Sequence, residues 1–505
     1  MLNKYIKKIL DARVYDVAIE SPLTHARSLS QRLGNQVHLK REDLQPVFSF
    51  KLRGAYNRVR QLSDEDKAKG VIAASAGNHA QGLALAAKTL GIKATIVMPK
   101  TTPEIKVSSV RARGAKVVLV GDTFDEASAY AQEQVAEKGL VYIPPYDDED
   151  VIAGQGTVAM ELLKQHPDKA HAVFIPCGGG GLIAGMAAYI KYLRPDIKVI
   201  GVEPEDAACL QAAMKSGKRV VLDQVGIFAD GVAVRQIGKL PWDVCKDHVD
   251  DVITVTTDEI CAAIKDIFDD TRGIAEPAGA IGVAGLKKYV EQTNVEGENL
   301  LTVVSGANMN FDRMRYISER TEIGEKREAI LAVTLPEKPG SYKKFIKALH
   351  RRNITEFNYR YTDGSDAQIF VGVQTSGVEG ERVQLVEGLE EQGYPVMDLT
   401  DNEVAKLHVR HMVGGPSNAE NEQVFRFQFP ERPGALMKFL TSLGSKWNIS
   451  MFHYRNHGAA YSRVFMGVQV SEEEKPTFLA MLDEIGFPYW DESDNPAYLQ
   501  FLRAK

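Results

Sequence analysis

A single lysine lies in a run of residues that otherwise has the apolar spacing of a buried helix. Lys51 stands between Phe50 and Leu52 in the stretch FSFKLRGAYN, and apolar residues follow at helical spacing. This pattern places Lys51 in the first turn of a helix, with Ser49 as the N-cap. A helix N-terminus and apolar neighbours both favour the neutral amine, which is the form that attacks a carbonyl group. The alternative is a lysine whose ammonium group reaches water.

Four consecutive glycines follow a predicted strand. The stretch CGGGGLIAG (177–185) comes after AVFIP and opens a helical pattern. Glycines let backbone N–H groups converge on an anion at a helix N-terminus, so the loop predicts phosphate binding. The loop also satisfies the dinucleotide fingerprint G-x-G-x-x-A through Gly179, Gly181 and Ala184, with Glu203 ending the next strand. Spacing alone therefore leaves an NAD-dependent oxidoreductase open.

Two further stretches end predicted strands with small polar residues. SAGNHAQG places Ser75, Gly77, Asn78 and His79 where a strand turns into a helix. Free N–H groups at such a turn suit a carboxylate, and an asparagine amide can donate to a ring oxygen. SGAN places Ser305 directly after the strand LLTVV. Each stretch by itself is equally typical of an ordinary helix cap.

The elements that must position these residues alternate between strand and helix. From residue 71 to 304, short apolar runs such as GVIAAS, KATIVMP and KVIGVEP alternate with helical patterns. Such alternation predicts parallel strands in a layered α/β fold. Ligands in these folds bind beyond the carboxyl ends of the strands. The three candidate loops lie at those ends.

The chain changes character after about residue 320 and then repeats itself. Three stretches recur 94 or 95 positions later: LPEKPG (335–340) as FPERPG (429–434), NITEFNYR (353–360) as NISMFHYR (448–455), and FVGVQ (370–374) as FMGVQ (465–469). Each copy has the order strand, helix, strand, strand, helix, strand, which is typical of a ferredoxin-like domain. We expect domains at 1–320, 330–413 and 422–505, with a polar linker at 321–329.

Composition limits the function classes. The 505 residues carry a net charge of −6 with both signs well mixed, so we expect neither nucleic acid nor a membrane surface as a partner. The four cysteines form no CxxC pair, and no apolar run reaches transmembrane length. The N-terminal stretch lacks the pattern of a secretory signal. These features predict a cytoplasmic protein.

Taken together, the motifs carry a family resemblance. SFKLRGA, SAGNHAQG, GGGGL and SGAN resemble, in this order, the landmarks of fold-type II pyridoxal-phosphate (PLP) enzymes, specifically the serine/threonine dehydratase branch. The resemblance covers residues 1 to about 320 and implies an α/β, tryptophan synthase β-like catalytic domain. The tail resembles two ACT-like regulatory domains, as in biosynthetic threonine deaminases, and extends the resemblance over essentially the whole chain.

The resemblance implies a role for each candidate residue. Lys51 and Ser305 would be catalytic, with Lys51 bonded covalently to PLP and Ser305 at the pyridine nitrogen. The implied cofactor-binding set is Lys51, Phe50, Asn78, Gly178, Gly179, Gly180, Gly181, Leu182 and Ser305. The implied substrate-binding set, for the substrate carboxylate, is Ser75, Gly77, Asn78 and His79. No metal is implied, because Cys209 replaces the acidic residue that metal-activated relatives have after the VEP turn.

The resemblance also implies an activity and its control. The expected reaction is β-elimination of L-threonine to 2-oxobutanoate and ammonia, the first committed step of isoleucine biosynthesis, with L-serine as a second candidate substrate. Isoleucine would inhibit through the tail, valine would counteract it, and the chain would form a homotetramer.

Two alternatives stay open at this point. An NAD-dependent oxidoreductase would use the Gly179–Ala184 fingerprint, but it leaves Lys51 and the tail unexplained. A non-catalytic amino-acid sensor would need a decayed catalytic domain, and the intact loops argue against decay.

Overall fold

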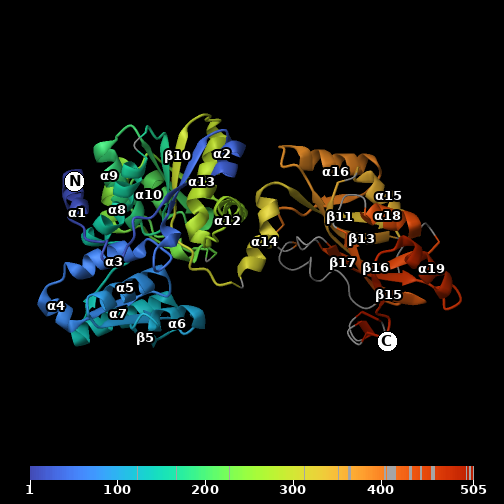
Figure 1. Cartoon of the computed structure of the whole chain (residues 1–505), viewed down its shortest axis with the longest axis horizontal. Coiled ribbons are helices and arrows are strands. Elements are labelled where there is room, and N and C mark those ends of the chain that lie inside the picture. Colours follow the sequence, from blue (N-terminus) through green and yellow to red (C-terminus); the bar gives the residue numbers. More distant parts are fainter. Residues whose placement is uncertain are drawn as a thin grey trace. The chain divides into compact units, whose positions relative to one another are not determined.

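The computed structural model divides the chain into two compact units, Met1–Gly324 and Glu325–Lys505 (Figure 1). The structure describes all residues except 122, 167, 227, 312, 351, 362–365, 403–404, 406–416, 431–434, 444–445, 456–460, 496–497, 500–501 and 504–505. Within the described residues, every helix is too short or too polar to cross a membrane.

The smaller sheet of the first unit is entirely parallel, as the alternating pattern predicted. Its order is β5-β4-β3-β6. The strands are β3 (Val71–Ala74), β4 (Ala94–Met98), β5 (Lys116–Leu119) and β6 (Val141–Tyr142), and the nearby helices are α3 (Lys51–Arg60), α4 (Asp64–Lys69), α5 (Asn78–Thr89), α6 (Glu104–Arg111) and α7 (Phe124–Lys138). Because β3 lies between β4 and β6, the turn that follows it is a topological switch point, where ligands bind in such sheets.

The larger sheet has the order β1-β2-β10-β7-β8-β9. Among the described pairs of this sheet, β1–β2 is antiparallel and all the others are parallel. Its strands are β1 (Leu23–His25), β2 (Gln36–Arg41), β7 (Ala172–Pro176), β8 (Lys198–Pro204), β9 (Asp251–Val255) and β10 (Asn299–Val304). The other helices are α1 (Leu2–Leu10), α2 (Arg27–Leu33), α8 (Glu149–Gln165), α9 (Gly181–Leu193), α10 (Cys209–Ser216), α11 (Lys239–His248), α12 (Thr257–Thr271), α13 (Pro277–Thr293) and α14 (Arg313–Gly324). A second switch point follows β7, which lies between β10 and β8.

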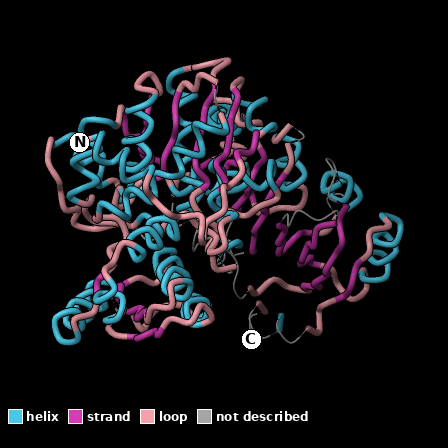
Figure 2. The backbone as a smooth tube through the Cα atoms, turned by 60° about the vertical axis from the view of Figure 1, so that its left-hand side comes forward, coloured by secondary structure: helices cyan, strands magenta, loops and turns pink. Residues whose placement is uncertain are grey.

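Strand β7 shows why this sheet is covered on both faces. Val173 and Ile175 belong to an apolar cluster with α8 and α9, whereas Ala172 and Phe174 belong to a separate cluster with α12 and α13. Successive side chains of a strand point to opposite faces, so an uninterrupted apolar strand requires helices on each side. Figure 2 shows helices on both sides of these strands.

The second unit has the predicted order of elements in each repeat. The first repeat contains β11 (Glu328–Pro336), α15 (Ser341–Ala348), β12 (Ile354–Arg360), β13 (Asp366–Gln374), α16 (Glu381–Glu391) and β14 (Val396–Asp398). The second contains β15 (Glu422–Pro430), α18 (Ala435–Leu443), β16 (Asn448–Arg455), β17 (Tyr461–Gln469), α19 (Lys475–Ile485) and β18 (Tyr489–Asp491). All these strands form one sheet, β14-β11-β13-β12-β16-β17-β15-β18.

The two repeats join through a symmetric strand pair. Strands β12 and β16 are antiparallel, and Asn358 lies opposite His453, its own equivalent in the other repeat. The equivalent rings of Phe357 and Phe452 touch with centroids 5.5 Å apart. A local pseudo-two-fold axis therefore passes between the repeats, as at an isologous dimer interface.

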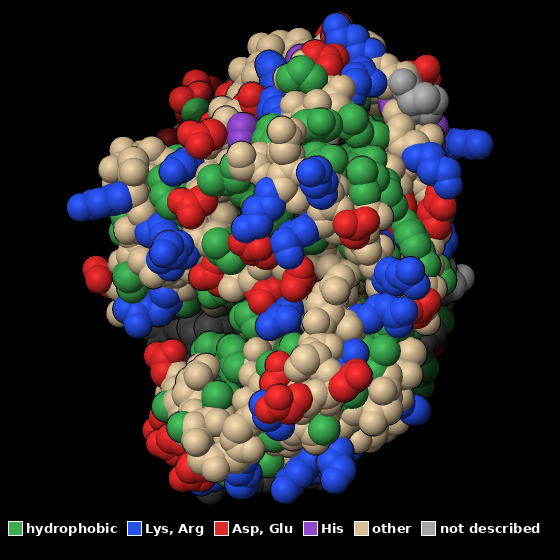
Figure 3. All heavy atoms as spheres, turned by 90° about the vertical axis from the view of Figure 1, so that its left-hand side faces the viewer, with side chains coloured by type: hydrophobic (Ala, Val, Ile, Leu, Met, Phe, Trp, Pro, Cys, Tyr) green, Lys and Arg blue, Asp and Glu red, His purple; other side chains and the backbone are tan. Residues whose placement is uncertain are grey.

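The expected linker region 321–329 contains regular structure at both ends. Helix α14 continues to Gly324, and β11 begins at Glu328. The helix belongs to the first unit, because Arg320 forms an ion pair with Asp258 of α12 and the Thr321 hydroxyl donates to the Cys261 carbonyl oxygen. On the face of the first unit drawn in Figure 3, acidic and basic side chains are interspersed.

Candidate active site

Lys51 is the first residue of α3, as its spacing predicted. Its side chain is partly buried, and Nζ donates a hydrogen bond to the carbonyl oxygen of Pro145 at 2.9 Å. Nζ also lies 5.3 Å from the centroid of the Phe50 ring. Burial lowers the pKa of the Lys51 amine to about 8, because a charged amine loses hydration there. The expected lowering of the Lys51 pKa, which favours the neutral amine, is therefore confirmed.

The prediction that Ser49 caps α3 is wrong. The N-cap is Phe50, and among the described residues no side chain caps the helix. Ser49 instead pairs through its backbone with Gly306, and this bridge fixes the chain that enters α3. The Ser49 side chain is fully buried, and its Oγ makes no hydrogen bond within the described part of the chain. Such an orphaned buried hydroxyl is uncommon and marks a place where a ligand could bind.

The glycine loop turns from β7 into α9 as predicted. Gly180 is the N-cap of α9 with φ of 89°, a left-handed conformation that favours glycine. A Cβ atom on Gly179 would lie 2.1 Å from the Tyr146 ring, and one on Gly178 would lie 2.8 Å from Val232 Cα. The loop thus tolerates only glycine at these positions. No side chain caps α9, so its first N–H groups suit an anion.

The structure brings the loops after β3 and β10 together. Asn78 is the first residue of α5, and Gly77 is its N-cap. The Asn308 amide donates to Asn78 Oδ1 at 2.6 Å, joining SGAN to SAGN. Ser75 Oγ accepts the Gly77 N–H at 3.3 Å, and Ser75, Gly77 and Asn78 are all partly exposed.

His79 and Ser305 are both buried. The His79 Nε2 lies 2.8 Å from the Ile143 carbonyl oxygen. Burial lowers the His79 pKa to about 3, so the ring is neutral and Nε2–H is the donor to this carbonyl. Ser305 Oγ donates to the Ala278 carbonyl oxygen at 3.2 Å, and the Ser305 carbonyl oxygen accepts the Phe50 N–H at 3.3 Å. The backbone of Ser305 therefore contacts the residue that precedes Lys51.

Sequence reasoning missed an acidic residue in this cluster. Glu276 precedes α13 as its N-cap and is 4% exposed. Its carboxylate accepts a hydrogen bond from Asn78 Nδ2 at 2.6 Å. Burial raises the Glu276 pKa to about 7. The only sequence signal was a glutamate directly before Pro277 at the start of an apolar helix, which is equally typical of an ordinary helix start.

Glu203 does not act as the dinucleotide fingerprint requires. That fingerprint needs a carboxylate able to reach a ribose hydroxyl. The Glu203 side chain is fully buried, and its two oxygens accept the N–H groups of Leu210 and Gln211 at 2.8 and 2.9 Å. Cys209 in turn donates to the Gly178 carbonyl oxygen at 3.3 Å. The segment after β8 therefore contacts the glycine loop. Because the Glu203 carboxylate is already used by these backbone N–H groups, it is not available to a ribose hydroxyl, which argues against a bound dinucleotide.

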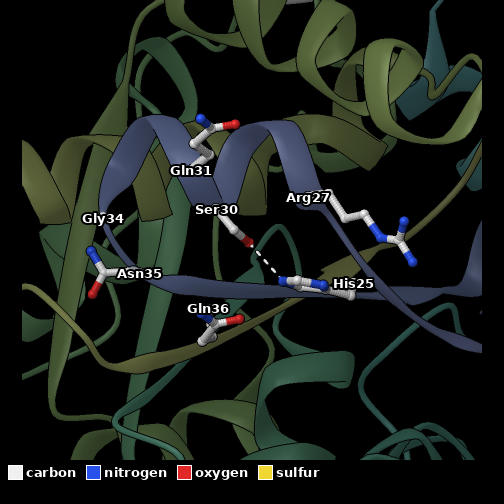
Figure 4. A pocket seen from close by; sticks show the side chains of 7 residues that line it. All are labelled: His25, Arg27, Ser30, Gln31, Gly34, Asn35 and Gln36. Carbon is white, nitrogen blue, oxygen red and sulfur yellow. Dashed lines mark hydrogen bonds between the residues drawn. The ribbon is translucent and has the colours of Figure 1, made fainter.

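A polar groove beside α2 contains none of the predicted residues. It is lined by residues of β1, α2 and the start of β2, and Figure 4 shows Ser30 and His25 pointing toward one another. Ser30 Oγ lies 3.1 Å from His25 Nε2 and accepts the Val37 N–H at 2.9 Å. The His25 ring stacks on His38, whose pKa burial lowers to about 4. These side chains form hydrogen bonds and ring contacts with one another, so we interpret the groove as part of the packing of the fold and not as a binding site.

Comparison with known proteins decides the family. Residues 14–306 match the family model of pyridoxal-phosphate dependent enzymes. Residues 319–409 and 413–502 match the C-terminal regulatory domain of threonine dehydratase. The biosynthetic L-threonine dehydratase of Burkholderia multivorans is 54% identical over 99% of both chains. The chain belongs to the biosynthetic threonine dehydratase family.

Other threonine dehydratases and solved structures agree with this membership. The biosynthetic L-threonine dehydratase of Escherichia coli is 52% identical over 99% of this chain and 97% of its own. The processed form of threonine deaminase isoform 2 from Solanum lycopersicum is 51% identical, with a TM-score of 0.63 over 64% of this chain and 88% of that one. Maize serine racemase is 34% identical, with a TM-score of 0.59 over 62% of this chain and 95% of that one. The predicted fold class and the PLP cofactor are thereby confirmed.

The residues present fit the cofactor of this family. Lys51 offers an amine with a lowered pKa, and the glycine loop opens a helix without a side-chain cap. The orphaned Ser49 hydroxyl lies two residues before Lys51. An aldehyde requires such an amine, and a phosphate group requires such N–H donors.

Proposed function

We propose that this chain converts L-threonine to 2-oxobutanoate and ammonia at Lys51, as the first committed step of isoleucine biosynthesis, and that its C-terminal repeats bind isoleucine as an inhibitor. The observation that carries the proposal is the partly buried Lys51 amine, whose pKa is lowered to about 8. Its acceptor Pro145 directly precedes Tyr146, whose ring packs against Gly179 of the glycine loop. The printed names of the relatives support threonine as the substrate. Serine, which lacks one methyl group, is a second candidate substrate.

The residues of the chain have distinct proposed tasks in holding the cofactor. Lys51 forms the covalent attachment, and Phe50 packs on the ring. The N–H groups of the loop residues Gly178, Gly179, Gly180, Gly181 and Leu182 bind the phosphate group. Asn78 donates to the ring oxygen, and Ser305 faces the pyridine nitrogen. When bound, PLP supplies the electron sink for the reaction.

The proton transfer is assigned to Lys51. Once the substrate amine has displaced it, the neutral Lys51 amine removes the proton from Cα of threonine, and the β-hydroxyl group leaves as water. Ser75, Gly77 and Asn78 orient the substrate carboxylate through the partly exposed turn at the N-terminus of α5. His79 supports this turn through its bond to Ile143. The resulting enamine tautomerises to an imine, whose hydrolysis consumes one water molecule and releases 2-oxobutanoate and ammonia.

Regulation is assigned to the second unit. An effector changes activity only if it binds one conformational state better than another. The repeats share one sheet and one apolar core, so they form a single body in which an effector bound to either repeat can act on both. We further propose that valine opposes isoleucine, that the chain forms a homotetramer and that it is cytoplasmic.

The experiment that tests the function compares the full chain with Lys51→Ala. The unsubstituted protein should be yellow when loaded with PLP and should release 2-oxobutanoate from threonine. Lys51→Ala should lose turnover by at least about a thousandfold, together with the borohydride-reducible chromophore. Turnover in the variant at the rate of the unsubstituted protein would contradict the assignment of Lys51. A protein that binds PLP but releases no ketoacid would instead be an amino-acid sensor.

A further inference from the structure

Three amide and carboxyl side chains form a continuous hydrogen-bonded row in the active site. Asn308 donates to Asn78 Oδ1 at 2.6 Å, and Asn78 Nδ2 donates to Glu276 Oε1 at 2.6 Å. Asn308 also donates to the Val47 carbonyl oxygen at 2.7 Å, so both of its N–H hydrogens are used. The row connects the loop after β10, the first residue of α5 and the N-cap of α13.

The row fixes the Asn78 amide in one orientation. An asparagine amide has a carbonyl oxygen that only accepts and a nitrogen that only donates. The Asn308 donor requires the Asn78 oxygen on one side, and the Glu276 acceptor requires its nitrogen on the other. A flipped Asn78 would bring its own N–H donors against the Asn308 donor and its oxygen against the Glu276 acceptor. One hydrogen of Asn78 Nδ2 is then left for another acceptor.

The backbone around Glu276 is shaped to admit its carboxyl group. A Cβ atom on Gly306 would lie 2.5 Å from Glu276 Oε1, and one on Gly231 would lie 3.6 Å from the same oxygen. The same Cβ atom on Gly231 would lie 3.9 Å from Asn78 Nδ2, so both of its distances are ordinary contacts. A buried carboxyl group is costly unless it is hydrogen-bonded. Gly306 therefore leaves the space that the Glu276 carboxyl group occupies.

We propose that Glu276 is a positioning residue of the cofactor site, which holds the Asn78 amide so that its second N–H hydrogen is presented to the ring oxygen of PLP. This inference rests on the proposed function, because it requires PLP at Lys51. Charged groups near Glu276 are Asp230, from the short helix Asp230–Val232, and Lys106 of α6, which pair with each other at 2.6 Å. Their charges oppose one another, so the specific interactions of the Glu276 carboxyl group are the hydrogen bonds that it accepts from Asn78 Nδ2 and from the Asn308 backbone N–H.

The test is a double-mutant cycle on cofactor affinity, measured by titrating the full-length apoprotein with PLP and recording the absorbance of the bound form. Glu276→Ala and Asn78→Ala should each weaken PLP binding about tenfold, and the double variant should also lose only about tenfold. Glu276→Gln should bind within about threefold of the unsubstituted protein, because its amide oxygen still accepts the Asn78 N–H. Asp266→Asn removes another buried carboxylate, which binds Arg32 and Lys287, and should leave PLP affinity unchanged.

Three results would overturn the inference. PLP affinity of Glu276→Ala equal to that of the unsubstituted protein would show that Glu276 does not hold Asn78. Losses that multiply in the double variant would show that the two residues act independently. A loss in Glu276→Gln as large as in Glu276→Ala would exclude the hydrogen bond as the cause. If the unsubstituted protein itself formed no chromophore with PLP, the proposed function would fail instead.

Discussion

At the scale of single residues, two lysines in the first unit donate hydrogen bonds to different kinds of acceptor. Lys40 is fully buried, and burial lowers its pKa, but it donates to the carboxylate of Glu161 at 2.6 Å, so a negative charge compensates part of this effect. Lys51 donates to a neutral carbonyl oxygen, and burial alone lowers its pKa to about 8. The ordinary pKa of lysine is about 10.4. Because a carbonyl oxygen cannot neutralise an ammonium group, the geometry favours the neutral amine at Lys51.

This difference predicts how pH controls cofactor attachment. The neutral fraction of an amine rises about tenfold per pH unit below its pKa and levels off above it. The rate at which apoprotein forms the PLP chromophore should therefore rise from pH 6 to about pH 8 and then level off, as measured by stopped-flow absorbance. A lysine derivative free in solution is the control, and its rate should continue to rise to about pH 10. A protein profile that follows the free amine would refute the lowered pKa.

The lowered pKa of Lys51 also makes the free energy of unfolding depend on pH. Between about pH 8 and 10.4 the unfolded chain holds a proton at Lys51 that the folded chain has lost. The contribution of Lys51 to the free energy of unfolding therefore rises with pH across this window. Below pH 8 the cost of burying the charged amine is fully present. This cost is expected at a residue whose proposed role requires the neutral amine.

At the scale of elements, α3 is anchored by a charged residue two positions after Lys51. Arg53 is fully buried, and its guanidinium group donates to Glu42 at 2.8 Å and to Glu161 of α8 at 2.6 Å. Burial acts to raise the Glu42 pKa, but Arg53 more than offsets this effect and the pKa is lowered. The network joins α3 to α8 and to the end of β2, so it fixes the helix that presents Lys51.

Removing Arg53 should therefore destabilise the first unit strongly. Arg53→Met would leave two buried carboxylates facing Lys40 alone, and we expect a loss of about 3–5 kcal/mol in the free energy of unfolding. Urea denaturation followed by circular dichroism measures this loss. Lys69→Ala is the matched control, because its ion pair with Glu65 is exposed and should contribute less than about 1 kcal/mol. Equal effects of the two substitutions would show that the buried network does not anchor the helix.

The same network explains which elements could be predicted from the sequence. The apolar strands β3, β7 and β10 and the loops after them follow from periodicity, because their side chains are buried for simple hydrophobic reasons. Strand β2 could not be found in this way. Its last residues are buried through ion pairs: Lys40 pairs with Glu161, which lies 121 positions away, and Arg41 pairs with Asp43, two positions along the chain. Glu276 escaped prediction for the same reason, since its partner Asn78 lies 198 positions away.

At the scale of the whole molecule, the regulatory repeats form one cooperative body. Arg360 of β12 donates to both carboxylate oxygens of Glu422 in the other repeat, at 2.5 and 3.1 Å. These side chains are 3% and 4% exposed. The Tyr498 hydroxyl also donates to Glu422, at 2.7 Å, so the end of the chain contacts the same carboxylate. A buried pair of this kind fixes the register of the β12–β16 seam more than it adds stability.

This organisation predicts that catalysis and inhibition can be separated at Gly324. A chain that ends there keeps α14, whose bonds to Asp258 and Cys261 cover α12, and lacks the entire body that we assign to isoleucine. It should release 2-oxobutanoate from threonine within several-fold of the full-length rate, and isoleucine should no longer inhibit it. A ketoacid assay with an isoleucine titration of both forms measures this, with circular dichroism as the check on folding. Isoleucine inhibition of the shortened chain at the same concentration would place the effector site in the first unit, because no residue of either repeat would then be present to bind it.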